Sequence, residues 1–415
     1  MSEAVVIHGA GLLDVDAGGV LLDRQLLVRD GRIEAVLHAG EPTPDDARSL
    51  DLAGLTVLPG LIDCHSHLIG DLEFAGIPAT ATSAAEEAMT GVRNARATID
   101  AGFTTVRDVG TYRAFVDVAL RDAIDRGWVV GPRMQCVGAY ITSPGGGGEV
   151  TGLALDVELP ADLRFGVVRS PAEARQKVRE LVAGGADLIK LIVTGAVLTR
   201  GTRPEVVELD EATVRAAVEE ATSHGVFVAA HAHGTEGIKV AIRAGVRSIE
   251  HGSLIDDEGI AMLAASGTYW VADIYDGDWI EETGTRDGWP AETLEKNRQT
   301  TDAQRDGFRK AVAAGVKLAY GTDSGVYPHG LNARQLPYLV RYGMTTAEAL
   351  RSATVVASEL LGWGDRVGRL APGYAADLIG VEGDPLADVG ILSDVPIVMK
   401  AGMVVKDARG TSQGA

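Results

Sequence analysis

Cysteine is scarce in this sequence, and long hydrophobic runs are missing from it. Only Cys64 and Cys136 occur among 415 residues, too few for a disulfide framework. They fall in segments that we predict to be different strands, so we do not expect them to pair. No hydrophobic run approaches the roughly 18 residues of a membrane helix, and the first residues lack the basic and apolar stretches of a secretion signal. We expect a cytoplasmic protein without membrane partners.

Positive charge is also in short supply. Lysine and arginine number 38 against 58 acidic residues, which gives a net charge of −20. This balance opposes binding to the phosphates of nucleic acids and to anionic membranes. Hydrophobic residues make up 46% of the chain, enough for a large core. We therefore expect the partners to be a small-molecule substrate and further copies of the chain in a homo-oligomer.

Short hydrophobic runs rich in β-branched residues alternate with helical patterns through the middle of the chain. Alternating strands and helices are typical of an α/β protein with a parallel sheet, and eight such units favour a (β/α)8 TIM barrel. A doubly wound open sheet is the alternative. The eight runs lie at 56–68, 103–110, 133–142, 187–197, 226–234, 247–255, 268–275 and 316–325.

The two ends of the chain have a different pattern. Residues 1–56 contain alternating segments with an Asp-Gly turn signal and little helical periodicity, and residues 366–415 repeat this alternating character. The pattern indicates antiparallel strands. The simplest interpretation is one small β-sandwich domain built from both termini, packed against a barrel domain of residues 57–365. The non-periodic segment 143–168 follows the third predicted strand, where loops of a barrel form the rim of the active site.

Histidines gather at the predicted strand ends. His65 and His67 end the first run in DCHSH, and because side chains alternate along a strand, both face the same way. Imidazole is a common ligand of divalent transition metals, although a lone His-x-His pair is more often incidental. His231, His233 and His251 end the fifth and sixth runs. Active sites of TIM barrels lie at this face, so the cluster predicts a metal centre.

A lysine and an aspartate complete the candidate site. Lys190 lies in LIKLIV within the fourth run, where a bare ammonium group is costly to bury. Its ordinary interpretation is a lysine that reaches solvent or pairs with a carboxylate. Beside two metal ions, a neutral amine can instead take up carbon dioxide and become a bridging carbamate. Asp323, in YGTDSG after the eighth run, supplies a carboxylate, although aspartate there is often a cap or turn residue.

These motifs, taken in order, resemble those of a known group of enzymes. The chain resembles the amidohydrolase superfamily, especially its prolidase-like and imidazolonepropionase-related hydrolases, over nearly its whole length. The motifs that carry the resemblance are LPGLIDCHSHL, GFTTVRDVG, GADLIKLIVTGAV, VAAHAHG, SIEHGSLI, AYGTDSG and ELLGWGDRVGRLAPGYAADLIGVEGDPL.

The resemblance implies a two-metal site, with zinc as the usual ion. His65, His67 and Asp323 would hold the more buried ion, and His231 and His251 the more exposed one. Carboxylated Lys190 and a hydroxide would bridge them. The implied mechanism is hydroxide attack on an amide carbonyl, with Asp323 carrying the proton to the leaving nitrogen.

Substrate contacts are predicted from the loops at the strand ends. His233 is expected either to support a ligand or to contact the substrate carbonyl, as a second catalytic group beside Asp323. Tyr140, Tyr275 and Tyr327 are candidate pocket walls, with packing as the alternative. Arg200 and Arg203 could clamp a substrate carboxylate, or be solvated. His329 is expected to be solvated.

One departure from the family pattern concerns the loop after the third strand. Relatives with dipeptidase activity tend to have Gly-Gly-His-Gly-Asp there, whereas this chain has Gly147 in place of the histidine. Three hypotheses follow: an amide hydrolase for dipeptides or N-acyl amino acids; a hydrolase for cyclic amides, ureas, carbamates or esters; and a non-catalytic scaffold. The third predicts decayed metal ligands, yet all six expected residues are present.

Overall fold

The computed structural model of the chain describes residues 4–69, 80–154 and 156–409. Within these residues, no helix has the length and hydropathy needed to cross a membrane. Cys64 and Cys136 are both buried free thiols on different strands, as predicted.

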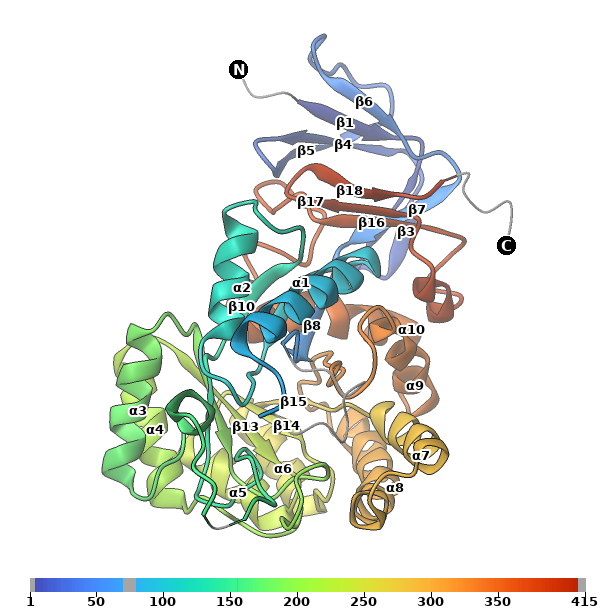
Figure 1. The fold of residues 1–415 in the computed structure, drawn as a ribbon. Helices are drawn as coiled ribbons and strands as arrows, with labels where there is room; N and C mark the ends of the chain where they lie inside the picture. Colours follow the sequence, from blue (N-terminus) through green and yellow to red (C-terminus); the bar gives the residue numbers. More distant parts are fainter. Residues whose placement is uncertain (1–3, 70–79, 155, 410–415) are drawn as a thin grey trace.

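Strands and helices alternate through the body of the molecule, as the sequence predicts (Figure 1). The strands are β8 (Leu61–Ser66), β9 (Phe103–Asp108), β10 (Arg133–Cys136), β11 (Tyr140–Ile141), β12 (Leu188–Ile192), β13 (Phe227–Ala232), β14 (Ser248–His251) and β15 (Tyr269–Val271). The helices are α1 (Ala84–Asp100), α2 (Val116–Asp125), α3 (Pro171–Ala183), α4 (Glu211–Ser223), α5 (Thr235–Ala244), α6 (Asp257–Ser266), α7 (Asp276–Asp287), α8 (Ala291–Ala313), α9 (Leu336–Arg341), α10 (Thr346–Arg351) and α11 (Ala357–Leu360).

The strands of the body pair in parallel. Their orders are β10-β9-β8 and β11-β12-β13-β14-β15. The amide of Asp187, just before β12, donates to the carbonyl of Cys136 at 2.8 Å and links the two sheets. The eighth predicted run is too irregular to form a regular strand, but it makes parallel bridges on both sides, Trp270 with Leu318 and Ser66 with Ser324. The arrangement is therefore TIM-barrel-like.

Local signals set the ends of these helices. Ser83 and Glu86 form a reciprocal capping box at the start of α1, which satisfies amide donors that a helix leaves free. Asp256 accepts from the Gly259 amide at the start of α6. At the other end, α5 stops at Gly245, whose φ of 91° is left-handed. Glycine adopts this conformation without strain, so it can end the helix there.

The chain termini form two further sheets, at the top of Figure 1. One has the order β5-β4-β1-β6 and the other β18-β17-β16-β7-β2-β3. The strands are β1 (Val5–His8), β2 (Gly11–Asp14), β3 (Gly19–Leu21), β4 (Arg24–Arg29), β5 (Arg32–His38), β6 (Arg48–Asp51), β7 (Leu55–Pro59), β16 (Leu378–Glu382), β17 (Ile397–Lys400) and β18 (Met403–Asp407).

Two details of the terminal sheets differ from the sequence prediction. Most pairs are antiparallel, but β1 pairs with β6, and β2 with β7, in parallel, because longer connections replace hairpins there. Strand β7 also pairs with β16 and β2, so the first half of the run 56–68 belongs to the terminal sheets. Its second half, β8, belongs to the body.

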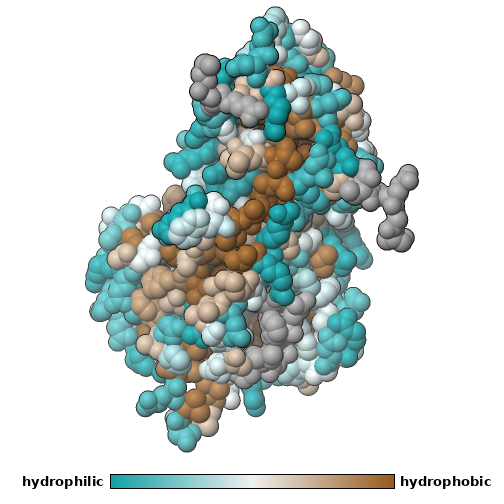
Figure 2. Space-filling view, turned by 45° about the horizontal axis from the view of Figure 1, so that its top comes forward, coloured by the Kyte–Doolittle hydropathy of each residue, from teal (hydrophilic) through white to brown (hydrophobic). Residues whose placement is uncertain are grey.

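The two terminal sheets share one apolar core. Ile7 and Val28 of the first sheet cluster with Val57, Leu378 and Ile397 of the second. A larger cluster fills the body between strands and helices. On the face drawn in Figure 2, hydrophobic residues form a band that runs from the terminal sheets toward the body, with hydrophilic residues on either side.

Candidate metal centre

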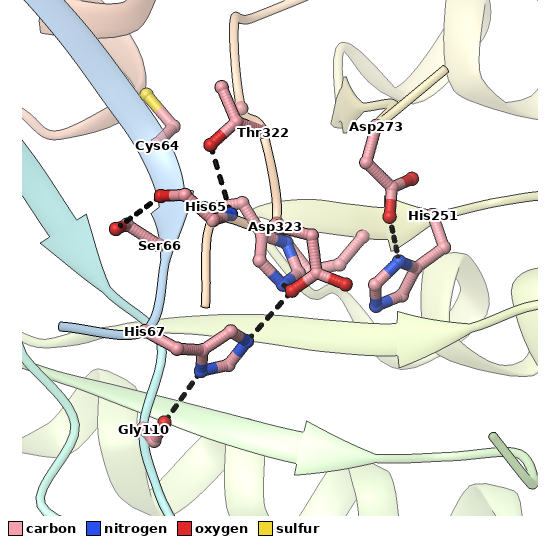
Figure 3. A network of polar contacts seen from close by, with 12 residues as sticks. Cys64, His65, Ser66, His67, Gly110, His251, Asp273, Thr322 and Asp323 are labelled. Carbon is pink, nitrogen blue, oxygen red and sulfur yellow. Dashed lines mark hydrogen bonds and ion pairs between the residues drawn. The ribbon is translucent and has the colours of Figure 1, made fainter. Parts of the chain in front are cut away.

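His65 and His67 project from the carboxyl end of β8 toward Asp323 (Figure 3). His65 Nδ1 lies 2.8 Å from Oε2 of Glu250. His65 Nε2 is buried, has no hydrogen-bond partner among the described residues, and lies 3.4 Å from Asp323 Oδ1. A buried nitrogen without a partner is rare. Its position suits a metal ligand.

His67 is oriented by the backbone. Its Nδ1 lies 2.6 Å from the Gly110 carbonyl oxygen. Since a carbonyl only accepts, Nδ1 carries the proton and Nε2 keeps its lone pair. That Nε2 lies 3.0 Å from Asp323 Oδ1. Both histidines therefore direct a nitrogen toward the same carboxylate oxygen.

The other three predicted histidines form a second group beside the first. The rings of His231 and His251 lie 4.5 Å apart, and those of His65 and His251 4.7 Å apart. Ligand atoms of His231, His233 and His251 lie within 4.8 Å of one another, and the same holds for His65, His251 and Asp323. Two overlapping sets of donors, sharing His251, can hold metal ions.

Each histidine of this second group has a different kind of hydrogen-bond partner. His251 Nδ1 lies 2.6 Å from Asp273 Oδ2, and His233 Nδ1 lies 2.8 Å from Ser253 Oγ. His231 Nε2 lies 3.2 Å from the Gly195 carbonyl oxygen, so its other nitrogen is the one with a free lone pair in this tautomer. Burial lowers the pKa of His233 to about 3. A neutral imidazole is the form that binds a metal or accepts a proton.

Lys190 lies on β12 and faces the cavity next to these donors. Its side chain is 1% exposed, and among the described residues no carboxylate lies within ion-pairing distance of its ammonium group. Within the described residues Lys190 therefore has no direct carboxylate partner, although the charge of Glu250 acts on it. Burial lowers its pKa to about 8. A larger share of neutral amine follows, and the neutral amine is the form that adds to carbon dioxide.

The backbone is strained where two of these donors lie. His251 and Asp323 have φ values of 67° and 56°, in the left-handed region that costs a non-glycine residue on the order of 1–3 kcal/mol. His251 is the last residue of β14, and Asp323 lies near the end of the eighth run. Both side chains line the cavity.

Buried charged residues that were not predicted from the sequence hold the histidines in place. Arg107 on β9 donates to both oxygens of Glu250, at 2.7 and 2.8 Å, and Glu250 holds His65. Asp63 accepts from the backbone amide of His65 at 3.1 Å and from the Thr322 hydroxyl at 2.6 Å. A signal was available, because a charged residue inside an apolar strand run needs a partner.

The donors lie in a cavity of about 580 Å³. The lining includes His65, His67, Lys190, His231, His233, His251 and Asp323, together with Tyr140 and Gly147. The Tyr140 hydroxyl donates to the Gly110 carbonyl at 3.0 Å, which leaves its ring as part of the wall. The structure thus brings together the six predicted ligands and two predicted substrate contacts, Tyr140 and His233.

The remaining predicted substrate contacts do not line this cavity. Tyr275 and Tyr327 pack against each other with ring centres 5.1 Å apart. Arg200 is exposed, and Arg203, whose side chain is 69% exposed, pairs with Glu205 at 2.8 Å. The two tyrosines therefore pack against each other and the two arginines are solvated, which are the alternatives to substrate contact given above.

His329 was expected to be solvated, and this is wrong. Its Nδ1 lies 3.0 Å from Thr98 Oγ1 and its Nε2 lies 3.1 Å from the His67 carbonyl oxygen. Burial lowers its pKa to about 4. The sequence carried no sign of these contacts because Thr98 is 231 positions away.

A sequence profile of the amidohydrolase family matches residues 56–405. The chain belongs to the amidohydrolase family. It is 31% identical to the ochratoxinase of Aspergillus niger over 97% of this chain and 87% of that protein. It is 29% identical to the imidazolonepropionase of Chromobacterium violaceum over 87% of this chain and 86% of that protein.

Solved structures agree with this membership. A crystal structure of a Xaa-Pro dipeptidase with methionine bound in its active site superposes with a TM-score of 0.90. The two sequences are 34% identical, and the match covers 97% of this chain and 100% of that one. The protein is a hydrolase that acts on carbon–nitrogen bonds.

Proposed function

We propose that the protein is a binuclear metal-dependent amidohydrolase that cleaves an amide bond of a small molecule. The observation that carries the proposal is the Nε2 atom of His65, which is buried and has no hydrogen-bond partner among the described residues. Leaving such a nitrogen unsatisfied costs about 1–3 kcal/mol. A bound cation would remove that cost, and imidazole and carboxylate donors surround the position.

The donors divide between two divalent ions, for which we propose zinc. His65, His67 and Asp323 would hold one ion, His231 and His251 the other, and Lys190, carboxylated by carbon dioxide, would bridge both. The donor set fits, since nitrogen and oxygen ligands suit zinc and Lys190 has no competing carboxylate within the described residues. When bound, two such ions acidify a water molecule and polarise a carbonyl group.

The residues of the chain supply the proton transfers. Asp323 lies within 3.4 Å of both His65 and His67 nitrogens, so its carboxylate is next to the proposed ion and can accept the proton of the attacking water. The same group can deliver that proton to the leaving nitrogen, which an amine needs in order to depart. His233, held by Ser253 and lining the cavity, is proposed to contact the carbonyl oxygen of the substrate.

The substrate candidates come from the relatives. The Xaa-Pro dipeptidase supports dipeptides and N-acyl amino acids as the first class. Cyclic amides, ureas, carbamates and esters form the second class, which the imidazolonepropionase relative supports.

The proposal assumes a particular architecture. We infer that the eight parallel segments close into a (β/α)8 barrel, supported by the bridges of the eighth run to β15 and β8. We also infer that the terminal sheets form a β-sandwich, supported by their shared core. The sandwich would comprise the predicted segments 1–56 and 366–415, extended through β7 to Pro59.

The experiment combines metal analysis with a turnover screen. Protein produced with zinc supplied should carry about two ions per chain, lose its amidase activity to a chelator, and regain it with zinc. N-acyl amino acids, dipeptides, cyclic amides and aryl ureas form the panel. Absence of any transition metal from zinc-supplied protein would contradict the proposal and revive the scaffold hypothesis.

A further inference from the structure

We propose that the cavity selects amide substrates without a carboxylate beside the scissile bond, and that it packs an uncharged apolar substituent against Gly147. This inference rests on the proposed function and narrows its substrate class. It favours neutral amides over the N-acyl amino acids and dipeptides that the relatives suggest.

The charges on the cavity wall carry the first part of the argument. Apart from the proposed metal ligands, the charged residues that line the described cavity are Glu87, Asp276 and Asp287. All three are acids, which repel a carboxylate when ionised and offer no cation when protonated. Lys190 supplies the one ammonium group in the described lining, and it lies on the floor, among the metal donors.

The arginines near the cavity do not line it. Arg113 donates to Glu87 at 3.1 Å and to Asp162 at 2.5 Å, with its side chain 10% exposed. Arg113 therefore neutralises Glu87 from outside the cavity. Arg200 and Arg203 lie outside the lining. A carboxylate bound against this wall would lose its water and gain no charge partner.

Positive charge from bound ions does not alter this conclusion. Such charge lies among the donors on the floor, which is where the scissile carbonyl must be held. A carboxylate drawn to that position displaces the reacting group, so it makes the compound an inhibitor rather than a substrate.

The apolar wall of the cavity supports the second part of the proposal, the packing of an apolar substituent. Gly147, Ile192, Ala196, Val197 and Leu198 line one side of the cavity. A Cβ atom on residue 147 would lie 3.1 Å from Ile192 Cγ2 and 3.2 Å from Ala196 Cβ. These distances are tighter than ordinary contacts, so the missing side chain lets the loop pack closely against Ile192 and Ala196, and all three residues line the cavity.

The loop that carries Gly147 is held by its backbone on both sides. The amide of Gly147 donates to Glu208 Oε2 at 2.7 Å, and its carbonyl accepts from Thr199 Oγ1 at 2.6 Å. These contacts use the polar atoms of Gly147 and leave its α-carbon facing the cavity. The resulting surface is fixed and apolar, which suits a hydrocarbon or aromatic group.

The first test compares two substrates that differ in one group. N-benzoyl-L-leucine and N-benzoyl-L-leucine N-methylamide share the scissile bond, and released benzoate reports its cleavage in both. With the zinc-loaded enzyme we expect kcat/KM to be about tenfold or more higher for the uncharged compound. Equal values, or a preference for the carboxylate, would overturn the inference and leave the proposed function intact.

A variant of the cavity wall then tests whether the charge of the wall sets the preference for the uncharged substrate. Leu198 is half-buried at the cavity surface, so a longer polar chain can reach solvent there. Leu198→Lys should lower the preference for the uncharged substrate by about fivefold, whereas the matched neutral variant Leu198→Gln should not. An unchanged ratio in Leu198→Lys would show that wall charge does not set the preference.

A second variant tests the apolar contact. Gly147→Ala adds only a methyl group, at a φ that alanine can adopt since Gly147 is not in the left-handed region. Because the methyl group would lie only 3.1 Å from Ile192 and 3.2 Å from Ala196, these wall residues must shift, and we expect KM for the uncharged substrate to rise while kcat changes little. A loss of kcat with unchanged KM would contradict the proposed packing against Gly147.

Binding measurements distinguish a failure of this inference from a failure of the proposed function. Phosphonamidate analogues of the two compounds, in which tetrahedral phosphorus replaces the scissile carbonyl, are bound without turnover, and calorimetry gives their Kd. Tighter binding of the analogue that lacks the carboxylate supports the inference even if no amide is hydrolysed, in which case the proposed function alone fails. Tighter binding of the carboxylate analogue overturns the inference whether or not amides are hydrolysed.

Discussion

The cavity and the terminal sheets treat buried polar atoms in opposite ways. In the cavity, His65 Nε2 has no hydrogen-bond partner within the described residues, and His251 and Asp323 have left-handed backbones. In the terminal sheets, left-handed residues such as Asp30 occur in tight turns. No described side chain of 4–56 or 366–409 contains a buried polar atom that lacks a partner.

Two buried lysines, one in the cavity and one at the terminal sheets, differ in the same way. Burial lowers the pKa of both Lys190 and Lys400 to about 8. Lys400 donates to the carbonyl oxygen of Gly131 at 2.7 Å, so it has a structural partner between β17 and the loop before β10. Lys190 has none of that kind among the described residues. Lys400 is satisfied within the chain, whereas Lys190 has the place that we propose for a metal-bridging group.

The largest expected effect is that of Asp323→Asn. Asparagine has the same shape and tolerates a left-handed backbone, so the fold should persist, but it cannot accept the proton of the attacking water. We expect kcat to fall by roughly 10³-fold or more, with an unchanged circular dichroism spectrum. Wild-type kcat in a metal-loaded variant would show that Asp323 does not transfer the proton.

Replacing each buried lysine by methionine sharpens the contrast between the regions. Lys190→Met should reduce bound metal and lower kcat by about 10²-fold or more, without lowering the stability of the metal-free protein, because an unpaired buried ammonium group is removed. Lys400→Met, as the matched control, should keep metal content and kcat. Full activity in Lys190→Met would exclude a bridging role for this lysine.

A smaller loss is expected from Glu250→Gln. The variant keeps the shape but removes the negative charge that orients His65 and pairs with Arg107. We expect metal affinity to fall by about 10- to 100-fold, measured by competition with a chelator. Restored activity at high zinc concentration would identify Glu250 as a positioning residue, and unaltered affinity would argue against this role.

The smallest effect concerns the pH dependence of stability through Lys400. Its folded pKa is about 8 against 10.5 for an ordinary lysine, so between these pH values the unfolded chain binds more protons and stability rises with pH. Relative to Lys400→Met, the wild type should gain about 1 to 2 kcal/mol in free energy of unfolding between pH 8 and pH 10, since solvent still screens the group. Urea unfolding at both pH values measures this gain, and parallel pH profiles would contradict it.

Much of the site was predictable because its residues follow one rule. His65, His67, His231, His251 and Asp323 lie toward the carboxyl ends of the first, fifth, sixth and eighth predicted runs. The carboxyl ends of parallel strands meet at one face of a β/α protein. The substrate contacts were not predictable in this way. Arg203 and Tyr327 follow strand ends too, but loop geometry turns them toward Glu205 and Tyr275.

The sequence by itself determined the order of strands and helices and the identity of the candidate metal donors, because periodicity and strand ends are local properties of the chain. Only the tertiary structure decided which imidazole nitrogen faces the cavity, that Glu250 and Arg107 stand behind His65, and that no arginine lines the described wall. These depend on contacts between residues such as Arg107 and Glu250, 143 positions apart. Burial and pairing at that range are set when the elements pack, and no local pattern encodes them.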